Sequence, residues 1–300
     1  MKRKLNKISI LIINYNTDDL TIQAVNSVNN YVKDLQYEII VVDNCSPNGS
    51  NLNKKLKSIP NTFFYQLNQN IGFGRANNFA YSKSKGDYVF LLNSDAYLIS
   101  DIFPKLIKSI ESNTDIGCLS PNILLENREL AISYGSFLTK KKILNDLGLK
   151  KQKNEELNEI STSKKFKGKT LKRVDYVTGA AMLLKRDTIE EHGFFNSSYF
   201  MYFEDMDLCF RYKSNGLSSA IEPECEVVHI GGQSYLKTDF TQIKKVKIIL
   251  RSKYIFSKNL FSERQAKTYY FLSILKAYKI NILTQLKVKI LKLIKVIIKS

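Results

Sequence analysis

The strongest constraint on the fold is a repeated order of short apolar runs and helix-compatible segments in the first 120 residues. The apolar runs have the length and β-branched content of strands, and they cover 8–13, 38–43, 62–65, 88–93 and 116–119. The segments between them are compatible with helices, at 18–32, 50–58, 74–85 and 101–111. Several of these strands are apolar throughout, so both faces of their sheet must be covered. The sequence therefore predicts an α/β protein with a mostly parallel, doubly wound sheet that binds ligands at the carboxyl ends of its strands.

Polar side chains follow three of the predicted strands. The first strand ends in NYNT, with Asn14 and Tyr15, the second in VVDNCSPNGS, with Asp43, and the fourth in LLNSDAYL, with Asn93 and Asp95. A carboxylate just beyond a buried strand, with an amide two residues earlier, offers oxygen ligands to Mg²⁺ or Mn²⁺. The carboxylate at 43 could instead accept hydrogen bonds from a base or a ribose. Each of these residues is also common in caps and turns, so the structural alternative stays open.

Two glycine-containing segments add candidate ligand contacts. In NIGFGRANN, Gly72 precedes a predicted helix, and glycine there permits a diphosphate to approach the helix N-terminus. The spacing is not that of a dinucleotide fingerprint or a P-loop, so an ordinary turn is an equal alternative. In VVHIGG, His229 is followed by two glycines that allow a loop to fold over a ligand. A packed, hydrogen-bonded histidine is the alternative for this position.

An acidic group lies inside an aromatic stretch, YFMYFEDMDLCFR. Burying Glu204, Asp205 and Asp207 there costs free energy unless each carboxylate gains a partner or a proton. A helix is predicted from about 204 to Gly216, and acids in its first turn would also interact favourably with the helix dipole. In such a helix Asp205 and Asp207 point about 200° apart, so only one of them can face a ligand.

Positive charge is concentrated near the C-terminus. Residues 241–300 hold 15 Lys or Arg and a single acid, Glu263, whereas 1–240 hold 31 basic and 27 acidic residues. The segment 281–300 forms an amphipathic helical pattern with Lys on one face, which favours binding to an anionic membrane. A helix docked on the catalytic domain is the alternative. The aromatic residues of this tail are not interleaved for base stacking, so we expect no nucleic-acid partner.

The remaining composition predicts a cytoplasmic protein. The four cysteines are widely spaced, which indicates neither zinc ligands nor a disulfide framework. The start of the chain, MKRKLNKISILIINYN, is interpreted as a buried strand because its apolar run is short and no small-residue cleavage site follows. No apolar run reaches the ~18 residues of a transmembrane helix. We expect one domain over 1–240, containing a mobile loop or insertion at 139–172, and a basic helical extension over 241–300.

Together these segments resemble the family 2 glycosyltransferases, particularly the bacterial rhamnosyltransferase-like branch. The matching segments occur in the family's order between residues 8 and 232: SILIINYNT, VVDNCSPNGS, NIGFGRANN, GDYVFLLNSD, VDYVTGAAMLLKRD, GFFNSSYFMYFEDMDLCFR and VVHIGG. The resemblance implies a Rossmann-like GT-A fold. It also implies an inverting transfer of a sugar from a nucleotide diphosphate sugar.

The resemblance also implies roles for individual residues. Asp205 corresponds to the catalytic base, and Asp95 and His229 to ligands of Mg²⁺ or Mn²⁺. Tyr202 and Glu204 fall on the acceptor side. The nucleotide-sugar contacts implied are Asn14, Tyr15, Asp43, Gly72, Arg75, Asn78 and Asn93. The chain departs from the family pattern at Asn93, where the first acid of a DxD motif is absent, and at Asn77, which replaces the usual Arg.

The function implied is a metal-dependent hexosyltransferase of bacterial surface-polysaccharide biosynthesis. It would move rhamnose or a similar hexose from a dTDP- or UDP-linked donor to a glycan or lipid-linked acceptor. It would act peripherally at the inner face of the cell membrane. A non-catalytic nucleotide-sugar or glycan-binding module is the alternative; the joint presence of Asp43, Asp95, Asp205 and His229 argues against it.

Overall fold

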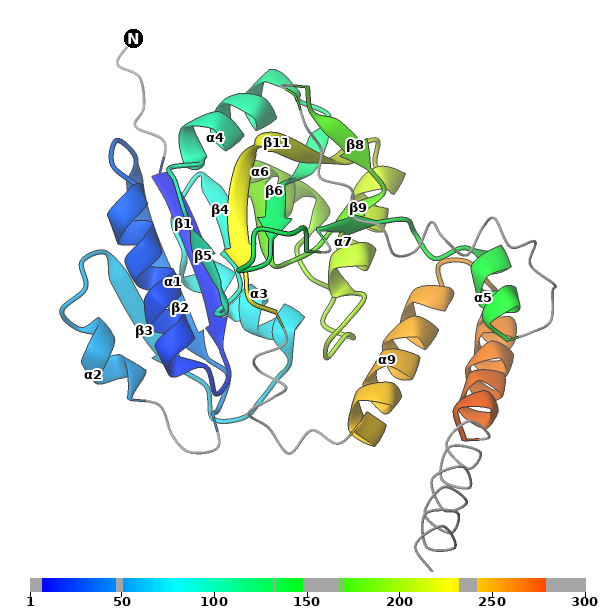
Figure 1. Ribbon diagram of the computed structural model, residues 1–300. Coiled ribbons are helices and arrows are strands. Elements are labelled where there is room, and N and C mark those ends of the chain that lie inside the picture. The colour runs from blue at the N-terminus through cyan, green and yellow to red at the C-terminus, as the bar shows by residue number, and fades with distance from the viewer. Residues whose placement is uncertain are drawn as a thin grey trace, which may run out of the picture. The chain divides into compact units, whose positions relative to one another are not determined.

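The structure is a computed structural model that describes residues 7–46, 51–131, 133–147, 168, 170–231 and 242–278. These residues divide into two compact units (Figure 1). The first contains the described residues up to Phe137 and those of 168–231. The second contains 138–147 and 242–278.

The first unit is built on a mixed sheet whose nine described strands have the order β3-β2-β1-β4-β10-β6-β11-β5, with β8 paired to β11. Their bounds are β1 Lys7–Asn14, β2 Gln36–Asp43, β3 Thr62–Gln66, β4 Tyr88–Leu92, β5 Ala96–Leu98, β6 Ile116–Leu124, β8 Lys172–Val174, β10 Ala181–Lys185 and β11 Ser218–His229. Strands β3, β2, β1 and β4 are parallel to one another, as are β6 and β11. Strand β10 lies antiparallel between β4 and β6. A small second sheet pairs β7 (Tyr134–Gly135) with β9 (Tyr176–Val177).

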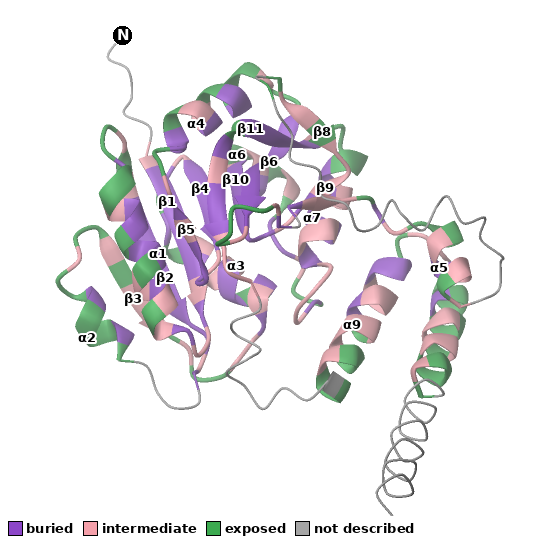
Figure 2. Cartoon of the chain, in the orientation of Figure 1, coloured by how far each residue is buried: buried purple, intermediate pink, exposed green. Residues whose placement is uncertain are grey.

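Helices cover both faces of the large sheet. Their bounds are α1 Asp18–Tyr31, α2 Leu52–Leu56, α3 Phe73–Lys83, α4 Phe103–Ser112, α6 Arg186–His192 and α7 Glu204–Ser214. Helices α1, α2 and α4 pack on one face, while α3, α6 and α7 lie on the other. The five residues of β4 are all buried, and buried residues fill the centre of the sheet (Figure 2). The predicted fold class is therefore confirmed, including the two covered faces.

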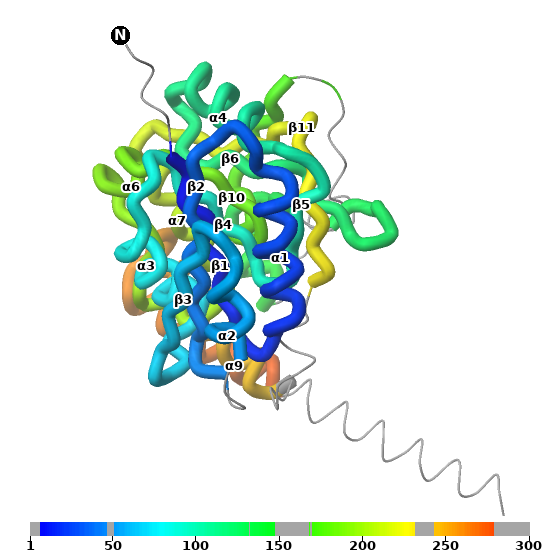
Figure 3. Tube along the Cα trace, turned by 90° about the vertical axis from the view of Figure 1, so that its left-hand side faces the viewer, coloured from blue at the N-terminus to red at the C-terminus, as the bar shows by residue number. Residues whose placement is uncertain are grey.

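The alternation of side chains along β1 explains how each face is filled. Ile8, Ile10 and Ile12 are fully buried in the cluster that contains Val25 and Val28 of α1. The residues between them point to the opposite face, where α3 packs against β1 (Figure 3). Because β1, β2 and β4 run in the same direction, the residues that follow them gather at one edge of the sheet.

Helix α7 begins after an unusual turn. Tyr202 and Phe203 have φ angles of 68° and 67°, so two successive non-glycine residues occupy the left-handed region. Such a conformation costs roughly 1–2 kcal/mol per residue and persists only where surrounding contacts hold it. One such contact is a hydrogen bond of 2.9 Å from the Phe73 amide to the Phe200 carbonyl. The start of α3 therefore holds the segment that leads into α7.

The second unit is helical and basic. It contains α5 (Lys140–Asp146), α9 (Gln242–Ser257) and a helix over 263–278. Tyr254 and Tyr270 stack with ring centroids 4.9 Å apart, and Ala266 is fully buried. Helix α5 lies in the segment expected to be an insertion of the first domain, yet it belongs to this unit. The rest of that expected loop, except for its last few residues, and the predicted helix 281–300 lie outside the described residues.

No helix within the described ranges is both long enough and apolar enough to cross a membrane.

We predict that Gly72→Ala destabilises the protein by about 3 kcal/mol or more, because two penalties coincide. Gly72 has a φ of 84°, and an added Cβ would lie 2.1 Å from the Phe200 carbonyl oxygen. Gly216 is the matched control, since its φ is 83° and an added Cβ would meet nothing within 4 Å. Gly216→Ala should cost only about 1 kcal/mol. Urea denaturation measures both variants, and equal losses would contradict the assigned contact.

Candidate active site

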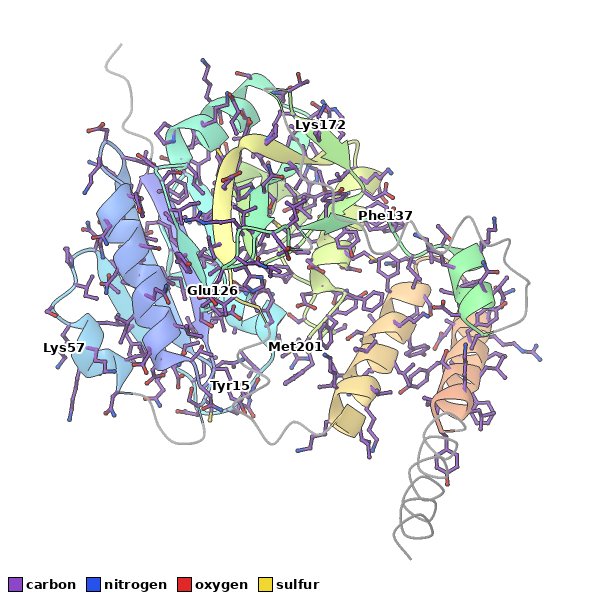
Figure 4. All side chains as sticks on the ribbon, in the orientation of Figure 1. Tyr15, Lys57, Glu126, Phe137, Lys172 and Met201 are labelled. Atoms are coloured by element: carbon purple, nitrogen blue, oxygen red, sulfur yellow. The ribbon has the colours of Figure 1, made fainter. Side chains whose placement is uncertain are left out.

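The ends of β1 and β2 form one buried hydrogen-bond network. Asn14 donates from Nδ2 to Oδ1 of Asp43 over 2.7 Å, and its own Oδ1 accepts from the hydroxyl of Thr17 over 2.9 Å. Asp43 also accepts from the hydroxyl and the amide of Ser46, over 2.6 and 3.1 Å. Asn14 and Asp43 are both fully buried, so in this structure they hold the strand-end loops in place. Tyr15, which directly follows Asn14, is only half-buried and lies at the edge where β1 ends (Figure 4).

The predicted nucleotide contacts on α3 are also engaged within the protein. Arg75 donates from Nε to the Ser197 carbonyl over 2.6 Å. Asn78 donates to the Phe195 carbonyl over 2.8 Å and accepts from the Phe195 amide over 3.1 Å. Gly72 allows the close backbone approach described above. These residues therefore fix the loop that leads into α7, and their contact with a nucleotide stays a prediction.

The candidate metal ligands converge from different parts of the chain. Strand β11 pairs with β5 so that His229 lies opposite Ala96. Ala96 directly follows Asp95 in the sequence, so His229 is brought close to Asp95. As a result the Nε2 atom of His229 is 3.1 Å from Oδ1 of Asp95. The same Nε2 atom is 3.3 Å from Nδ2 of Asn93. The structure thus brings His229 against Asn93 and Asp95, which lie more than 130 positions before it in the sequence.

The geometry of this group fits a divalent cation. Two neighbouring ligands of an octahedral ion, each about 2.1 Å from it, stand about 3 Å apart, which matches the Asp95–His229 separation. Asn93 has an enclosed Oδ1 atom without a hydrogen-bond partner. The described residues contain no group of three or more His, Cys, Asp or Glu arranged to hold a metal. A cation here would therefore take few protein ligands and fill its other positions from phosphate and water.

Asp205 lies at the start of α7 and is held by backbone amides. Its Oδ2 accepts from the Gly179 amide over 3.2 Å, and its Oδ1 accepts from the Met206 amide over 2.8 Å. Burial raises the pKa of Asp205, and these amide hydrogen bonds only partly oppose the shift. A carboxylate with a raised pKa and a fixed orientation is suited to accept a proton.

Glu204 occupies a more enclosed environment. It is only 5% exposed, and its Oε2 has no hydrogen-bond partner. Burial, with the neighbouring Asp205 charge as a second cause, raises the pKa of Glu204 to about 8. At neutral pH Glu204 therefore keeps its proton, which limits charge repulsion beside Asp205.

Asp207 has a different role from Asp205. It is buried, accepts from the Tyr199 hydroxyl over 3.1 Å and pairs with Nε of Arg211 over 2.9 Å. Arg211 in turn donates to the backbone carbonyls of His192 and Phe194. The expectation that only one of the two aspartates faces a ligand is consistent with these separate partners. Asp207 anchors α7 to the loop that precedes it.

Hydrogen bonds of ordinary length connect the end of β1, the candidate metal ligands and the segment that holds Asp205. The hydroxyls of Thr17 and Ser94 are hydrogen-bonded over 2.9 Å, linking the end of β1 to the candidate metal-ligand group. The Asn93 amide donates to the Ala180 carbonyl over 2.9 Å, and Ala180 follows the residue that bonds Asp205. Sequence reasoning missed Thr17, Ser94 and Ala180. Thr17 and Ser94 lie in the polar strand ends NYNT and LLNSDAYL, and Ala180 in a Thr-Gly-Ala segment directly before an apolar strand.

An aromatic group lies near Asp205. Phe137 stacks on Tyr176 with ring centroids 6.3 Å apart and meets Phe210 edge-on at 5.3 Å. Burial, together with the charge of Asp205, raises the pKa of Tyr176 to about 12. Just before α7, burial and the Glu204 charge raise the pKa of Tyr202 to about 12. Aromatic faces of this kind are suited to contact with a sugar ring.

Two curated relatives are glycosyltransferases. The chain is 25% identical over 264 residues to the low-salt glycan biosynthesis hexosyltransferase Agl10 of Haloferax volcanii, covering 86% of this chain and 78% of that protein. It is 28% identical over 235 residues to the rhamnosyltransferase WbbL of Escherichia coli K12, covering 73% of this chain and 82% of that protein.

Solved structures share the fold at low identity. GalNAc-T7 with UDP, GalNAc and Mn²⁺ superposes with a TM-score of 0.60 at 15% identity, covering 86% of this chain and 51% of that one. The mannosyltransferase PcManGT of Pyrobaculum calidifontis, with GDP-Man and Mn²⁺, gives 0.56 at 13%, covering 89% and 70%. TarS 1–349 of S. aureus gives 0.52 at 14%, also covering 89% and 70%. These neighbours identify the fold as GT-A.

The model of glycosyl transferase family 2 matches residues 9–192. This segment contains the ends of β1, β2 and β4 and the Thr-Gly-Ala segment, whereas Asp205 and His229 lie beyond it. Because the match covers more than half of the chain, the protein belongs to glycosyltransferase family 2.

Proposed function

We propose that the protein is a metal-dependent, inverting hexosyltransferase that uses a nucleotide diphosphate sugar. One observation carries the proposal: adjacent residues of one segment bond the candidate base and the candidate metal group. Gly179 donates to Asp205, and Ala180 accepts from Asn93. This arrangement fixes a carboxylate at a set position relative to the place where a diphosphate would leave.

In the proposed reaction Asp205 accepts the proton of the acceptor hydroxyl. The acceptor oxygen then attacks the anomeric carbon from the face opposite the departing diphosphate, which inverts the configuration at that carbon. The raised pKa of Asp205 improves proton transfer to this carboxylate. Its amide hydrogen bonds keep both oxygens oriented, so little reorganisation accompanies the transfer.

Asp95 and His229, together with the side-chain oxygen Oδ1 of Asn93, would hold Mg²⁺ or Mn²⁺. Such an ion supplies positive charge that stabilises the charge developing on a leaving diphosphate. The contribution of the protein would be to keep the two ligands about 3 Å apart. Two of the structural neighbours were crystallised with Mn²⁺, which supports a divalent cation here.

For the donor we propose rhamnose or a similar hexose linked to dTDP or UDP. The support is the activity of the two relatives, a hexosyltransferase of glycan biosynthesis and a rhamnosyltransferase. The acceptor would be a glycan or a lipid-linked glycan of bacterial surface-polysaccharide biosynthesis. Its sugar ring would contact the aromatic group of Phe137, Tyr176 and Phe210 and the side of Tyr202.

We also propose that the second unit holds the enzyme peripherally on the inner face of the cell membrane. Residues 242–278 contain nine Lys or Arg and one acid. On the helix 263–278 the exposed apolar residues have the spacing of a single face: Phe271, Ile274, Leu275 and Tyr278. An exposed apolar face with basic residues is typical of helices that bind anionic lipid surfaces. A lipid-linked acceptor would then share that surface with the enzyme.

The function is tested by nucleotide release from dTDP-rhamnose, UDP-glucose, UDP-N-acetylglucosamine and GDP-mannose, with Mn²⁺ or a chelator, in the presence of lipid-linked glycan. We expect metal-dependent release from one donor. Asp205→Asn should lower transfer roughly 10³-fold, because general bases contribute about 10²–10⁴, and should leave donor binding intact. Asp95→Ala should lower nucleotide release with Mn²⁺ to the level measured with the chelator.

The matched control for the base is Asp115→Asn. Asp115 is exposed and pairs with Arg173, so the same chemical change there should leave transfer unchanged. Wild-type transfer by the Asp205 variant would exclude it as the base. Donor binding without any turnover, in every condition, would favour a non-catalytic nucleotide-sugar-binding module.

The raised pKa of Glu204 predicts a pH-dependent stability. The folded carboxyl titrates at about 8, above its unfolded value near 4.3, so the folded state binds more protons between these values. The contribution of Glu204 to stability is therefore lost as the pH rises through this window. Glu204→Gln removes that loss, so its stability relative to wild type should be higher at pH 9 than at pH 6.

Urea denaturation at pH 6 and pH 9 measures this difference, with Glu126→Gln at an exposed position as the control. A difference between Glu204→Gln and wild type that is the same at both pH values would contradict the assigned protonation.

Membrane binding is tested by sedimentation with vesicles of equal phosphatidylglycerol and phosphatidylcholine. Replacing both Phe271 and Leu275 by Ser should weaken binding about 30-fold or more, because each buried apolar side chain contributes on the order of 1–2 kcal/mol and a loss of about 1.4 kcal/mol is a factor of ten. Phe63→Ser is the control, since Phe63 is 49% exposed but belongs to the first unit. Deleting 281–300 should weaken binding further. Unchanged binding after the double replacement and after the deletion would contradict the proposed surface.

A further inference from the structure

The connection between β9 and β10 spans the distance between the two halves of the site. The Gly179 amide donates to Oδ2 of Asp205, and the Ala180 carbonyl accepts from the backbone amide of Asn93. These two residues are neighbours, and their Cα atoms are therefore about 3.8 Å apart. A ligand that reached from the base to the candidate metal group would pass close to this connection.

The proposed reaction places the transferred sugar in that position. The acceptor oxygen, activated by Asp205, attacks from the face opposite the diphosphate. The diphosphate in turn lies on the side of Asn93, Asp95 and His229. The sugar ring is consequently between the two groups and beside residues 178–180.

Thr178, the first residue of this segment, has an unused hydroxyl. Its amide donates to the Ser133 carbonyl over 3.0 Å, which fixes its backbone. Its Oγ1 is enclosed and makes no hydrogen bond. The residue as a whole is half-buried, so a change of side-chain rotamer can turn the hydroxyl outward. A partner that the protein does not supply would make that rotamer favourable.

The other enclosed, unpaired side-chain atoms support a missing ligand at this place. Within the described residues five side chains have such an atom: Tyr81, Asn93, Asn145, Thr178 and Glu204. Two of the five adjoin the segment, because Thr178 is part of it and the backbone amide of Asn93 donates to Ala180. Unpaired buried polar groups are few in folded proteins, and a cluster of them indicates a site whose partner is absent.

The packing around the segment leaves little room beyond the backbone. An added Cβ on Gly179 would lie 3.1 Å from Cε1 of Phe73, so this ring covers the segment from the side of α3. Because the amides of Thr178 and Gly179 are already used within the protein, the group of this segment that remains for recognition is the Thr178 hydroxyl.

We propose that Thr178 is a specificity-determining residue of the donor site, and that its hydroxyl hydrogen-bonds a hydroxyl of the transferred sugar. This inference rests on the proposed function. It assigns Thr178 to the sugar and not to the nucleotide or the diphosphate.

Thr178→Val and Thr178→Ser test the assignment, because the first removes the hydroxyl at nearly constant shape and the second keeps it. Calorimetry with Mn²⁺ gives dissociation constants for the four nucleotide sugars named above and for UDP, GDP and dTDP. We expect Thr178→Val to weaken binding of the cognate nucleotide sugar about tenfold. Binding of the matching nucleoside diphosphate should not change, and Thr178→Ser should resemble wild type.

Two further expectations separate the proposed sugar contact from a merely structural role for Thr178, which would instead lower the unfolding temperature of Thr178→Val. Since its hydroxyl makes no hydrogen bond in the protein, Thr178→Val should unfold at the same or a higher temperature than wild type. A deoxy donor that lacks the partner hydroxyl should bind wild type and Thr178→Val equally. Equal losses for nucleotide sugar and nucleoside diphosphate, or no loss at all, would overturn the inference. If wild type binds none of the nucleotide sugars, the proposed function itself is contradicted.

Discussion

The arrangement of the site depends on the pairing of β10 with β4. Ala181, the first residue of β10, lies opposite Leu92, the last residue of β4. Because the two strands are antiparallel, the residues before β10 meet the residues after β4 at the carboxyl edge of the sheet. Gly179 and Ala180 thereby reach Asp205 on one side and Asn93 on the other. A parallel strand at this place would carry those residues to the opposite edge, away from both groups.

The acids of the site remain buried at a cost in free energy that the surrounding fold offsets. The cost of burying Asp207 is offset by its contacts with Arg211 and Tyr199, and the cost for Asp205 by hydrogen bonds from two backbone amides. Glu204 has no such partner for Oε2, and it is accommodated by keeping its proton. The left-handed turn at Tyr202 and Phe203 adds strain just before these residues. Unsatisfied and strained groups at one place are typical of sites that complete their contacts with a ligand.

The parallel half of the fold could be predicted from sequence because its signals are local. β-Branched runs and the helices between them gave the strands β1 to β4 and the helices α1 to α4 within a few residues. The antiparallel insertion of β10 could not be predicted, because strand order and register depend on contacts between distant residues. The helix α5 was missed because a Lys-rich segment has a weak apolar pattern.

The candidate site shows the same division between local and distant information. Helical geometry separated Asp205 from Asp207 without a structure, since both residues lie on one helix. The inward orientation of Asn14 and Asp43 was not predictable, because an amide and a carboxylate at a strand end suit a ligand and a loop equally well. The linking roles of Ser94 and Gly179 depend on partners more than 20 residues away, at Thr17 and Asp205.

The most direct test of the proposed account is the anomeric configuration of the product, measured by nuclear magnetic resonance on the newly formed linkage. A single carboxylate, Asp205, positioned to activate the acceptor predicts that the configuration is opposite to that of the donor. A product that keeps the donor's configuration would contradict the role assigned to Asp205 and the position proposed for the sugar.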